Sequence, residues 1–520
     1  MKQDLVLAID NGTQSVRALL FNLHGHLVHK AQIKLDSYTH ARPGWMEHDP
    51  DGFWTAVCRA CQELWLKSAI EPQQVRALVV TTQRGTVINL DKSGRPLRSA
   101  IIWADQRRAE ARAELPLAWR IAFKALRIED SIRSFEREAE SNWIAQNEPD
   151  IWAKTDKFLL LSGYLNYRFT GELKDGVGSQ VGYIPFDFKR GRWASRRDWK
   201  WACLHIDPAM LPTLVPSGAV IGKVTAQAAA DTGVPKGVPV IAGAADKACE
   251  VIGSGCLTPE VACLSYGTTA TINTMTPRYI EATPLIPPYP AAIPGRYNTE
   301  VQITRGYWMV SWFAEQFGLD ERMRAEASGL MPEVFFDELI NAAPVGSHGL
   351  MLQPFWNPGV RIPGPEARGA VIGFTDSHTR AHLYRAIIEG LAYALREGKG
   401  RIERRARTPI RLIRVAGGGS QSNAALQITA DIFNLPTERP SLYEASGLGA
   451  AILAGVGLGL HSSFETAVKE MTRVGRRFEP VPANVELYEQ LYSKVYVRMY
   501  ARLKPLYREL REIFERKQKE

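Results

Sequence analysis

One design occurs twice in the chain, each time as two apolar runs joined by a short polar turn. In residues 5–21 the turn is Asp10-Asn11-Gly12-Thr13-Gln14-Ser15, and in residues 260–275 it is Ser265-Tyr266-Gly267-Thr268-Thr269. Continuous apolar runs are typical of strands that are covered on both faces. Because Asn and Gly tolerate positive φ, Asn11-Gly12 predicts a hairpin turn. Backbone amides and hydroxyls exposed in such a turn can receive phosphate oxygens.

A second pattern also occurs twice, as an apolar run, an Ala-Gly turn and a helix-like stretch. The two copies are GVPVIAGAADKACEVIGSG (237–255) and IRLIRVAGGGSQSNAALQITADIF (410–433). In each half of the chain a hairpin comes first, and the strand, Ala-Gly turn and helix follow after a long interval. The whole order therefore occurs twice. The repeat predicts an α/β protein of two related lobes, 1–254 and 255–520, whose glycine turns face a shared cleft. Opposed glycine-rich turns let backbone amides approach a polyphosphate.

The composition excludes several classes of protein. The chain has 520 residues, of which 45% are hydrophobic and 23% charged, and it carries a net charge of +9. It contains no apolar run long enough to span a bilayer and no signal-peptide pattern, so we expect a cytoplasmic protein without a membrane partner. The basic excess alternates with Glu at helical spacing and lacks interleaved aromatic residues, which disfavours nucleic-acid binding. A mildly basic surface also suits phosphorylated substrates.

Cys58 and Cys61 form the one CxxC motif of the chain. Such a pair can be a redox or zinc motif, but Trp54, Val57, Cys61 and Leu64 recur at helical spacing. We therefore predict that both thiols lie on the buried face of a helix.

Seven motifs in succession resemble the landmarks of the FGGY carbohydrate kinases. They are DNGTQSVR, IIWADQRR, VIAGAADKA, LSYGTTA, GAVIGFTDSHTRAHLYRAIIEGLAYALRE, VAGGGSQSN and ASGLGAAILAGVGLG. Each motif is weak alone, but their order is specific, and the resemblance extends from Asp4 to about Glu479. It implies the actin-like, ribonuclease-H-like fold and the ATP-dependent phosphorylation of a hydroxyl of a small sugar, polyol or sugar acid, with Mg²⁺.

The resemblance makes Asp246 the candidate general base, which accepts the proton of the attacking hydroxyl. The alternative is that Asp246 caps the following helix. Lys247 stands where relatives often carry Gln or Asn, and its cation could contact the acceptor or the transferred phosphoryl group. Asp10 and Asp246 are the candidate magnesium ligands, since magnesium keeps part of its hydration shell and is held through carboxylates.

The resemblance places the nucleotide at three turns. Gly12, Thr13, Gln14 and Ser15 would face the terminal phosphates, with Arg17 as a supporting cation. Gly267, Thr268 and Thr269 would form the second phosphate turn. The adenosine pocket would be bounded by Gly417, Gly418, Gly419 and Ser420, with Gln421 or Asn423 offering an amide. The alternatives are an exposed strand residue for Arg17, an ordinary hairpin turn for Gly267–Thr269, and a helix start with Ser420 as its N-cap.

The acceptor pocket is expected in the first lobe. Gln83 and Arg84 resemble the pair that holds substrate hydroxyls in glycerol kinases, although Gly85 stands where those relatives have an acid. Trp103 and Asp105 resemble a pair that packs against and orients the acceptor, and Trp103 could equally be a core residue. With Asp246 and Lys247 they complete the predicted acceptor site. The charged segment Ile132–Trp143 is either a solvated helix face or part of a site for an acidic or branched acceptor.

Two other functions share this fold class. Actin-like ATPases can act as clamps or filaments, and a family member can bind sugar without transferring phosphate. The acceptor set Gln83, Arg84, Trp103 and Asp105 has no purpose in a filament, and Asp10 and Asp246 are both present. The predicted partners are therefore ATP and one small sugar or polyol, with a homodimer possible. The sequence leaves the acceptor unnamed.

Overall fold

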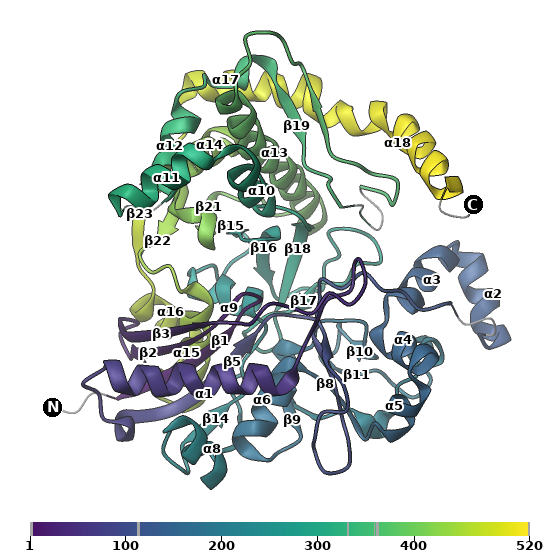
Figure 1. The fold of residues 1–520 in the computed structure, drawn as a ribbon, viewed down its shortest axis with the longest axis vertical. Coiled ribbons are helices and arrows are strands. Elements are labelled where there is room, and N and C mark those ends of the chain that lie inside the picture. Colours follow the sequence, from purple (N-terminus) through teal and green to yellow (C-terminus); the bar gives the residue numbers. More distant parts are fainter. Residues whose placement is uncertain (1–3, 112–114, 330–331, 358, 360–362, 518–520) are drawn as a thin grey trace. The chain divides into compact units, whose positions relative to one another are not determined.

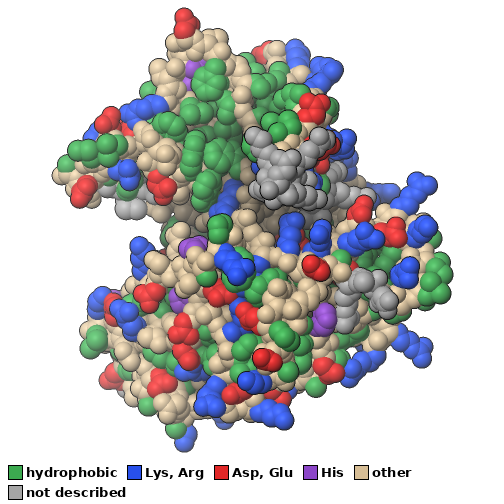
Figure 2. Space-filling view, turned by 45° about the vertical axis from the view of Figure 1, so that its right-hand side comes forward, with side chains coloured by type: hydrophobic (Ala, Val, Ile, Leu, Met, Phe, Trp, Pro, Cys, Tyr) green, Lys and Arg blue, Asp and Glu red, His purple; other side chains and the backbone are tan. Residues whose placement is uncertain are grey.

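The computed structural model describes residues 4–111, 115–329, 332–357, 359 and 363–517 (Figure 1). The chain forms two compact units, which do not follow a single cut in the sequence. The first unit contains residues 1–255, 289–297 and 445–472, and the second contains 256–288, 298–444 and 473–520. On the face shown in Figure 2, basic and acidic side chains are interspersed, so the net charge of +9 is not gathered there into one basic patch.

The first unit is built on a sheet of six strands in the order β13-β14-β5-β1-β2-β3. The strands are β1 (Leu5–Asn11), β2 (Ser15–Asn22), β3 (Leu27–Lys34), β5 (Val75–Thr82), β13 (Val220–Lys223) and β14 (Pro239–Ile241). β1, β2 and β3 form an antiparallel meander, whereas β1, β5 and β14 run parallel. Because parallel strands end at the same edge of a sheet, the residues that follow β1, β5 and β14 lie close together.

Helices cover both faces of this sheet. Leu7 of β1 and Leu20 of β2 pack in one core cluster with Phe53 of α1 (Pro50–Lys67), while Leu19 and Phe21 contact α15 (Ala445–Gly457). α6 (Leu161–Thr170) and α9 (Asp246–Gly253) complete the covering layers. Cys58 and Cys61 are buried in α1, which confirms the predicted core face.

A smaller sheet and four helices extend the first unit. The sheet has the order β4-β7-β6-β8 and contains β4 (Glu47–His48), β6 (Val87–Leu90), β7 (Ala100–Ile101) and β8 (Lys157–Leu160). The helices are α2 (Leu117–Leu126), α3 (Glu129–Glu138), α4 (Glu140–Asn147) and α5 (Pro149–Lys154). The loop after β7 carries Trp103 and Asp105, so this extension positions the predicted acceptor residues.

The second unit has a sheet with the same arrangement. Its strands follow the order β18 (Tyr297–Ile303), β16 (Ala270–Thr276), β15 (Val261–Tyr266), β21 (Leu412–Ala416), β22 (Thr437–Pro440) and β23 (Val474–Phe478). Again the central strand, β15, is antiparallel to the strand after its hairpin and parallel to the next strand across. The helices include α10 (Trp308–Phe317), α11 (Leu319–Ser328), α12 (Pro332–Asn341), α13 (Arg380–Ala406), α14 (Asn423–Phe433), α17 (Pro482–Leu491) and α18 (Val497–Lys517).

The strand orders correct one sequence-based pairing. β21, which precedes Gly417, pairs directly with β15, as β5 pairs with β1. β14, which precedes Asp246, lies one strand further out, where β22 lies in the other sheet. The two Ala-Gly turns therefore occupy different positions in the repeat, although both follow parallel strands. The sequence likeness arises because every strand-to-helix turn of this kind favours small residues.

The first hairpin turn also differs from its prediction. β1 ends at Asn11 and β2 begins at Ser15, and the Gly12 N–H donates to the Ser15 carbonyl over 3.1 Å. Neither Asn11 nor Gly12 has a positive φ. Asn11 pairs with Val16, so the four residues Gly12–Ser15 lie between the paired positions. This leaves the Thr13 and Gln14 side chains at the surface of the turn.

Candidate active site

Three parallel strands deliver polar residues to one edge of the first sheet. Asn11 of β1 pairs with Thr82 of β5, and Thr82 in turn forms a bridge with Ala245. The Thr81 hydroxyl also donates to the Ala244 carbonyl over 2.8 Å. The next residues along the three segments are Gly12, Gln83 and Asp246, so this register brings the first phosphate turn, an acceptor residue and the candidate base together.

Hydrogen bonds link the predicted phosphate turn to two predicted acceptor residues. The Thr13 hydroxyl donates to Gln83 Oε1 over 2.9 Å and accepts from Trp103 Nε1 over 3.0 Å. The Gln83 N–H donates to the Asn11 carbonyl over 2.9 Å, and the Tyr38 hydroxyl donates to the Thr13 carbonyl. Burial raises the pKa of Tyr38 to about 12, so its hydroxyl keeps the proton that it donates at neutral pH. Trp103 is partly exposed, packs against the core of the first unit and is held by its ring nitrogen.

Asp246 does not cap its helix. α9 begins at Asp246, its N-cap is Ala245, and no side-chain cap hydrogen bond is present. Asp246 Oδ1 accepts from the Lys247 N–H over 2.7 Å, and the carboxylate is partly exposed. Burial raises the pKa of the Cys249 thiol to about 12, and the charges of Asp10 and Asp246 act in the same direction. Both carboxylates therefore lie near this thiol.

Asp10 is 3% exposed and pairs with Arg17, which donates to its Oδ2 over 3.0 Å. The two residues face each other across β1 and β2, so Arg17 is neither isolated nor simply an exposed strand residue. No three His, Cys, Asp or Glu side chains of the described residues gather closely enough to hold a metal ion by themselves. Two carboxylates are nevertheless a donor set that magnesium accepts, because it retains several of its own waters.

Buried polar atoms without a partner mark the same edge. Within the described part of the chain, both amide atoms of Asn11 and Nε2 of Gln83 have no hydrogen-bond partner. Asn11 is 0% exposed and Gln83 is 3% exposed. An unpaired buried amide costs about 1–3 kcal/mol, so native proteins satisfy such groups with water, an ion or a ligand. These atoms fit an edge that receives a hydrated cation or a polar substrate.

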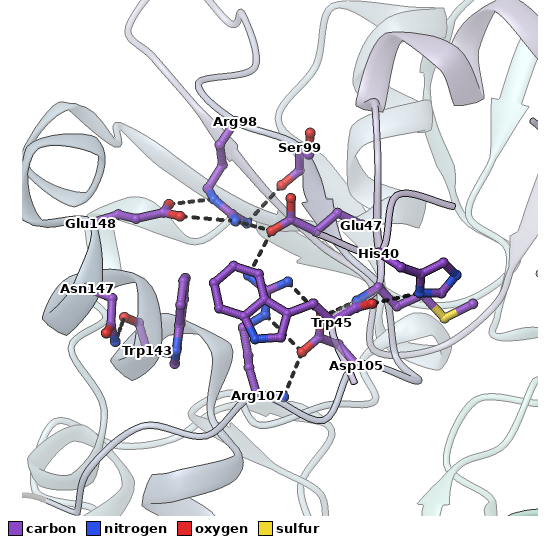
Figure 3. A network of polar contacts seen from close by, with 11 residues as sticks. His40, Trp45, Glu47, Arg98, Ser99, Asp105, Arg107, Trp143, Asn147 and Glu148 are labelled. Atoms are coloured by element: carbon purple, nitrogen blue, oxygen red, sulfur yellow. Dashed lines mark hydrogen bonds and ion pairs between the residues drawn. The ribbon is translucent and has the colours of Figure 1, made fainter. Parts of the chain in front are cut away.

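Asp105 belongs to an ion-pair network (Figure 3). Arg107 donates to Asp105 Oδ1 through Nε over 2.8 Å and to Oδ2 through Nη2 over 2.7 Å. The N–H groups of Arg107 and Met46 also donate to this carboxylate. With two hydrogen bonds on each oxygen, Asp105 has little capacity left for an acceptor hydroxyl. It instead holds the loop that carries Trp103.

Arg107 connects three segments of this network. Its guanidinium lies 4.0 Å from the ring centre of Trp45 and 4.6 Å from that of Trp143, and it donates to Glu47 over 2.7 Å. Arg98 also donates to Glu47, over 2.6 Å, and to Glu148 over 2.7 Å. The network ties α4 and the segment before β4 to the Trp103 loop (Figure 3). The IIWADQRR motif contains Arg107, but only its partners from distant segments show this role.

The remaining acceptor candidates carry charge. Arg84 lies over the ring of Tyr289, 5.0 Å from its centre, and Lys247 donates to Glu250 over 3.3 Å. In the charged segment, Glu136 is 1% exposed and Glu138 pairs with Arg108 over 2.8 Å, so the segment is not a uniformly solvated face. The pKa of Glu140 is raised to about 8, mainly by burial and to a smaller extent by the charges of Glu138 and Asp105.

The second unit holds its two predicted nucleotide turns side by side. The Tyr307 N–H donates to the Gly267 carbonyl over 3.1 Å, and the Thr269 hydroxyl donates to the Thr304 carbonyl over 3.0 Å. The Thr268 side chain is exposed. Gly417 has a φ of +82°, and a Cβ there would lie 3.0 Å from the Tyr266 carbonyl group. The turn after β21 therefore requires glycine and lies against the end of β15.

The helix that follows this turn begins two residues later than predicted. Ser422, not Ser420, is the N-cap of α14, and its hydroxyl accepts from the Ala425 N–H over 3.0 Å. Ser420 is buried in the preceding turn. The Asp337 carboxylate accepts from the Asn423 N–H over 2.9 Å, while Asn423 Oδ1 is buried without a partner among the described residues. Asn423 therefore keeps amide capacity for a ligand.

Tyr38, Arg107, Tyr307 and Asp337 were not among the predicted site residues. No sequence motif indicates their roles, because each acts through a contact with a segment distant in sequence. An aromatic or charged residue of this kind is recognisable only when its partners are known.

Comparison with known proteins identifies the class to which this fold and site belong. Family models for the N-terminal and C-terminal domains of the FGGY family of carbohydrate kinases match residues 5–253 and 262–458. An uncharacterized sugar kinase of Escherichia coli is 30% identical over 493 residues, covering 94% of this chain and 92% of its own. A xylulose kinase of Staphylococcus epidermidis is 30% identical over 497 residues, covering 94% and 95%.

A solved structure of a xylulose kinase from Rhodospirillum rubrum has a TM-score of 0.79 and 25% identity, and the match covers 97% of this chain and 100% of that one. The chain belongs to the FGGY family of carbohydrate kinases. It is an ATP-dependent phosphotransferase, and the predicted actin-like α/β fold is confirmed. Among the helices of the described residues, none is both long enough and apolar enough to cross a membrane.

Proposed function

We propose that the edge formed by β1, β5 and β14 transfers the terminal phosphoryl group of ATP to a hydroxyl of a small sugar, polyol or sugar acid, with Asp246 as general base. The observation that carries this proposal is the hydrogen-bond chain from Trp103 through Thr13 to Gln83. It joins a phosphate turn to acceptor residues beside the partly exposed Asp246. Phosphoryl transfer depends mainly on this kind of positioning.

Asp246 accepts the proton as the hydroxyl oxygen attacks. The proton leaves late in a loose transition state, so the carboxylate has to be positioned beside the attacking hydroxyl. Asp10 and Asp246 would hold Mg²⁺ through water, and the ion would supply positive charge beside the phosphate oxygens. Arg17, which donates to Asp10 Oδ2, keeps this carboxylate oriented.

The nucleotide is bound by backbone amides and hydroxyls of the glycine turns. The first turn offers Gly12, Thr13, Gln14 and Ser15, with Arg17 close by. In the second unit, the phosphate oxygens are bound by the hairpin turn Gly267, Thr268 and Thr269. The adenosine pocket is formed by Gly417, Gly418, Gly419, Ser420 and Asn423. The exposed Thr268 and the unpartnered Asn423 Oδ1 support these assignments.

The acceptor contacts Gln83, Arg84, Trp103 and Lys247, and Asp105 acts indirectly through the loop that it holds. Trp103 covers the apolar C–H face of a carbohydrate, while Gln83 binds its hydroxyls. Similarity to a xylulose kinase makes a ketopentose the first acceptor to test. Gly85 in place of an acid makes glycerol a weaker candidate.

The test is a coupled ADP-release assay with Mg-ATP across ketoses, polyols and sugar acids. For the acceptor that gives turnover, we expect Asp246→Asn to lower kcat by at least about 100-fold, which is the usual contribution of a general base. ATP binding, measured by calorimetry, should stay within a few-fold of wild type. The matched control is Asp130→Asn, which changes an exposed carboxylate in α3.

Near-normal turnover in Asp246→Asn would remove Asp246 from its role. ATP hydrolysis that does not respond to any acceptor would contradict phosphoryl transfer and favour an ATPase without transfer activity.

A further inference from the structure

Tyr307, immediately before α10, contacts both glycine turns of the second unit. Its N–H donates to the Gly267 carbonyl over 3.1 Å, and the Trp308 N–H donates to the Thr268 carbonyl over 3.4 Å. The first amides of α10 therefore bind the carbonyls of the hairpin turn. A helix N-terminus has unpaired N–H groups that must find acceptors, and here the turn supplies them.

The Tyr307 ring lies against the other turn. A Cβ added at Gly419 would come within 2.2 Å of Tyr307 Cε1, so the ring packs directly on the Gly419 backbone. The ring also stacks on Tyr266, the last residue of β15, with ring centres 4.4 Å apart and planes inclined by 22°. The Tyr266 hydroxyl is bonded to Thr429 in α14.

This arrangement is buried and closely packed. Tyr307 is 8% exposed and Tyr266 is 2% exposed. Burial raises the pKa of the Tyr307 hydroxyl well above its usual value, and the nearby Tyr266, Tyr384 and Asp337 act in the same direction. Asp337 in turn accepts from the first amides of α14. Tyr307 is thus held at its backbone by the Gly267 carbonyl and at its ring by Gly419 and Tyr266.

We propose that Tyr307 is a positioning residue that sets the distance between the phosphate turn Gly267–Thr269 and the adenosine turn Gly417–Ser420. The inference rests on the nucleotide roles proposed for these turns. One residue holds the first turn by its backbone and the second by its ring, so a change in ring size moves one turn relative to the other. ATP spans both turns and binds well only when their spacing matches its length.

The experiment enlarges residue 419, shortens residue 307, and combines both changes. Steady-state kinetics gives the KM for ATP, and calorimetry gives the affinity for ADP. Gly419→Ala adds a methyl group that collides with the ring, and we expect the KM for ATP to rise about tenfold or more with little change in the KM of the acceptor. Tyr307→Leu removes the ring and should raise the KM for ATP several-fold. In the double variant the collision with the ring is removed and only the contact with Tyr266 Cβ at 2.9 Å remains, so ADP should bind more tightly than to Gly419→Ala alone but less tightly than to wild type.

Phe313→Leu is the matched control, because Phe313 is a fully buried aromatic residue of α10 that packs on Tyr384. It should lower the melting temperature as Tyr307→Leu does and leave the KM for ATP unchanged. Tyr307→Phe keeps the ring and should retain near-normal ATP affinity. A double variant no better than Gly419→Ala, or an equal rise in KM for ATP in Phe313→Leu, would overturn the inference. Failure of the wild-type protein to bind ADP would overturn the proposed nucleotide site as well.

Discussion

Single side chains in this protein take their roles from distant neighbours. Asp105 lies in a motif that resembles an acceptor-binding pair, yet its oxygens are occupied by Arg107 and by the Met46 amide. Gln83 and Trp103, by contrast, both form hydrogen bonds with Thr13, a residue that the sequence assigns to the phosphate turn. Sequence patterns indicate which residues approach a site. They do not reveal how many hydrogen bonds each atom already has, because the partners lie in other segments.

Glu140 gives a prediction at the residue scale. Its pKa is raised from its usual value of 4.5 to about 8, mainly by burial and to a smaller extent by the charges of Glu138 and Asp105. Between these two pH values the folded protein keeps a proton that the unfolded chain has released, so stability from this group is present at low pH and is lost as pH rises to 8. The glutamine side chain of Glu140→Gln does not titrate, so the variant does not lose stability in this way as the pH rises. Relative to wild type, the variant should gain about 1–3 kcal/mol of unfolding free energy between pH 5 and pH 9.

Urea unfolding of both proteins at pH 5, 7 and 9 measures this gain. Glu326→Gln, which changes an exposed carboxylate in the second half of α11, serves as the control and should follow wild type at every pH. A constant difference between Glu140→Gln and wild type would show that Glu140 has an ordinary pKa.

At the scale of elements, strands and helices were easier to predict than turns. The apolar runs gave β1, β2, β15 and β16, and the Ala-Gly turns marked the starts of α9 and the turn before α14. The conformation of the first hairpin and the N-cap of α14 were not predicted correctly, since Asn-Gly and Ser suit several local geometries. α15, which contains most of the small-residue motif ASGLGAAILAGVGLG, packs closely on α9.

This contact gives a prediction at the element scale. A Cβ at Gly449 would lie 1.9 Å from the Cys249 carbonyl oxygen, and one at Gly253 would lie 1.9 Å from that of Ala445. Gly449→Ala must therefore separate the two helices, and we expect it to lower the unfolding free energy by about 1–3 kcal/mol. Thermal and urea unfolding measure the change. Ser446→Ala in the same helix adds no bulk and should stay within about 0.5 kcal/mol of wild type; a Gly449→Ala variant as stable as this control would contradict the close contact.

At the scale of the whole molecule, the repeat in the sequence predicted two related sheets but misaligned their parts. β21 corresponds to β5 and not to β14, because the number of strands between two motifs cannot be read from the motifs themselves. The sequence also suggested one division near residue 254. The first unit in fact includes residues 445–472, whose helix α15 packs on β1, β5 and α9.

A fragment of residues 1–255 should therefore fail to fold alone. It lacks α15, and Leu19 and Phe21, which are buried in the full chain, would be exposed on one face of the sheet. We expect the fragment to bind a hydrophobic dye and to unfold without a cooperative transition. Addition of a peptide of residues 445–472 should restore cooperative unfolding, whereas a peptide of the same composition in scrambled order should not. Cooperative unfolding of the fragment alone would show that α15 is dispensable.

The late position of α15 in the chain has a consequence for biosynthesis. A ribosome that has finished the strands of the first sheet must add about two hundred further residues before the covering helix emerges, which takes on the order of ten seconds or more at 5–20 residues per second. During that interval the nascent protein presents an uncovered apolar sheet face to the cell, and chaperones that recognise such surfaces have time to bind it.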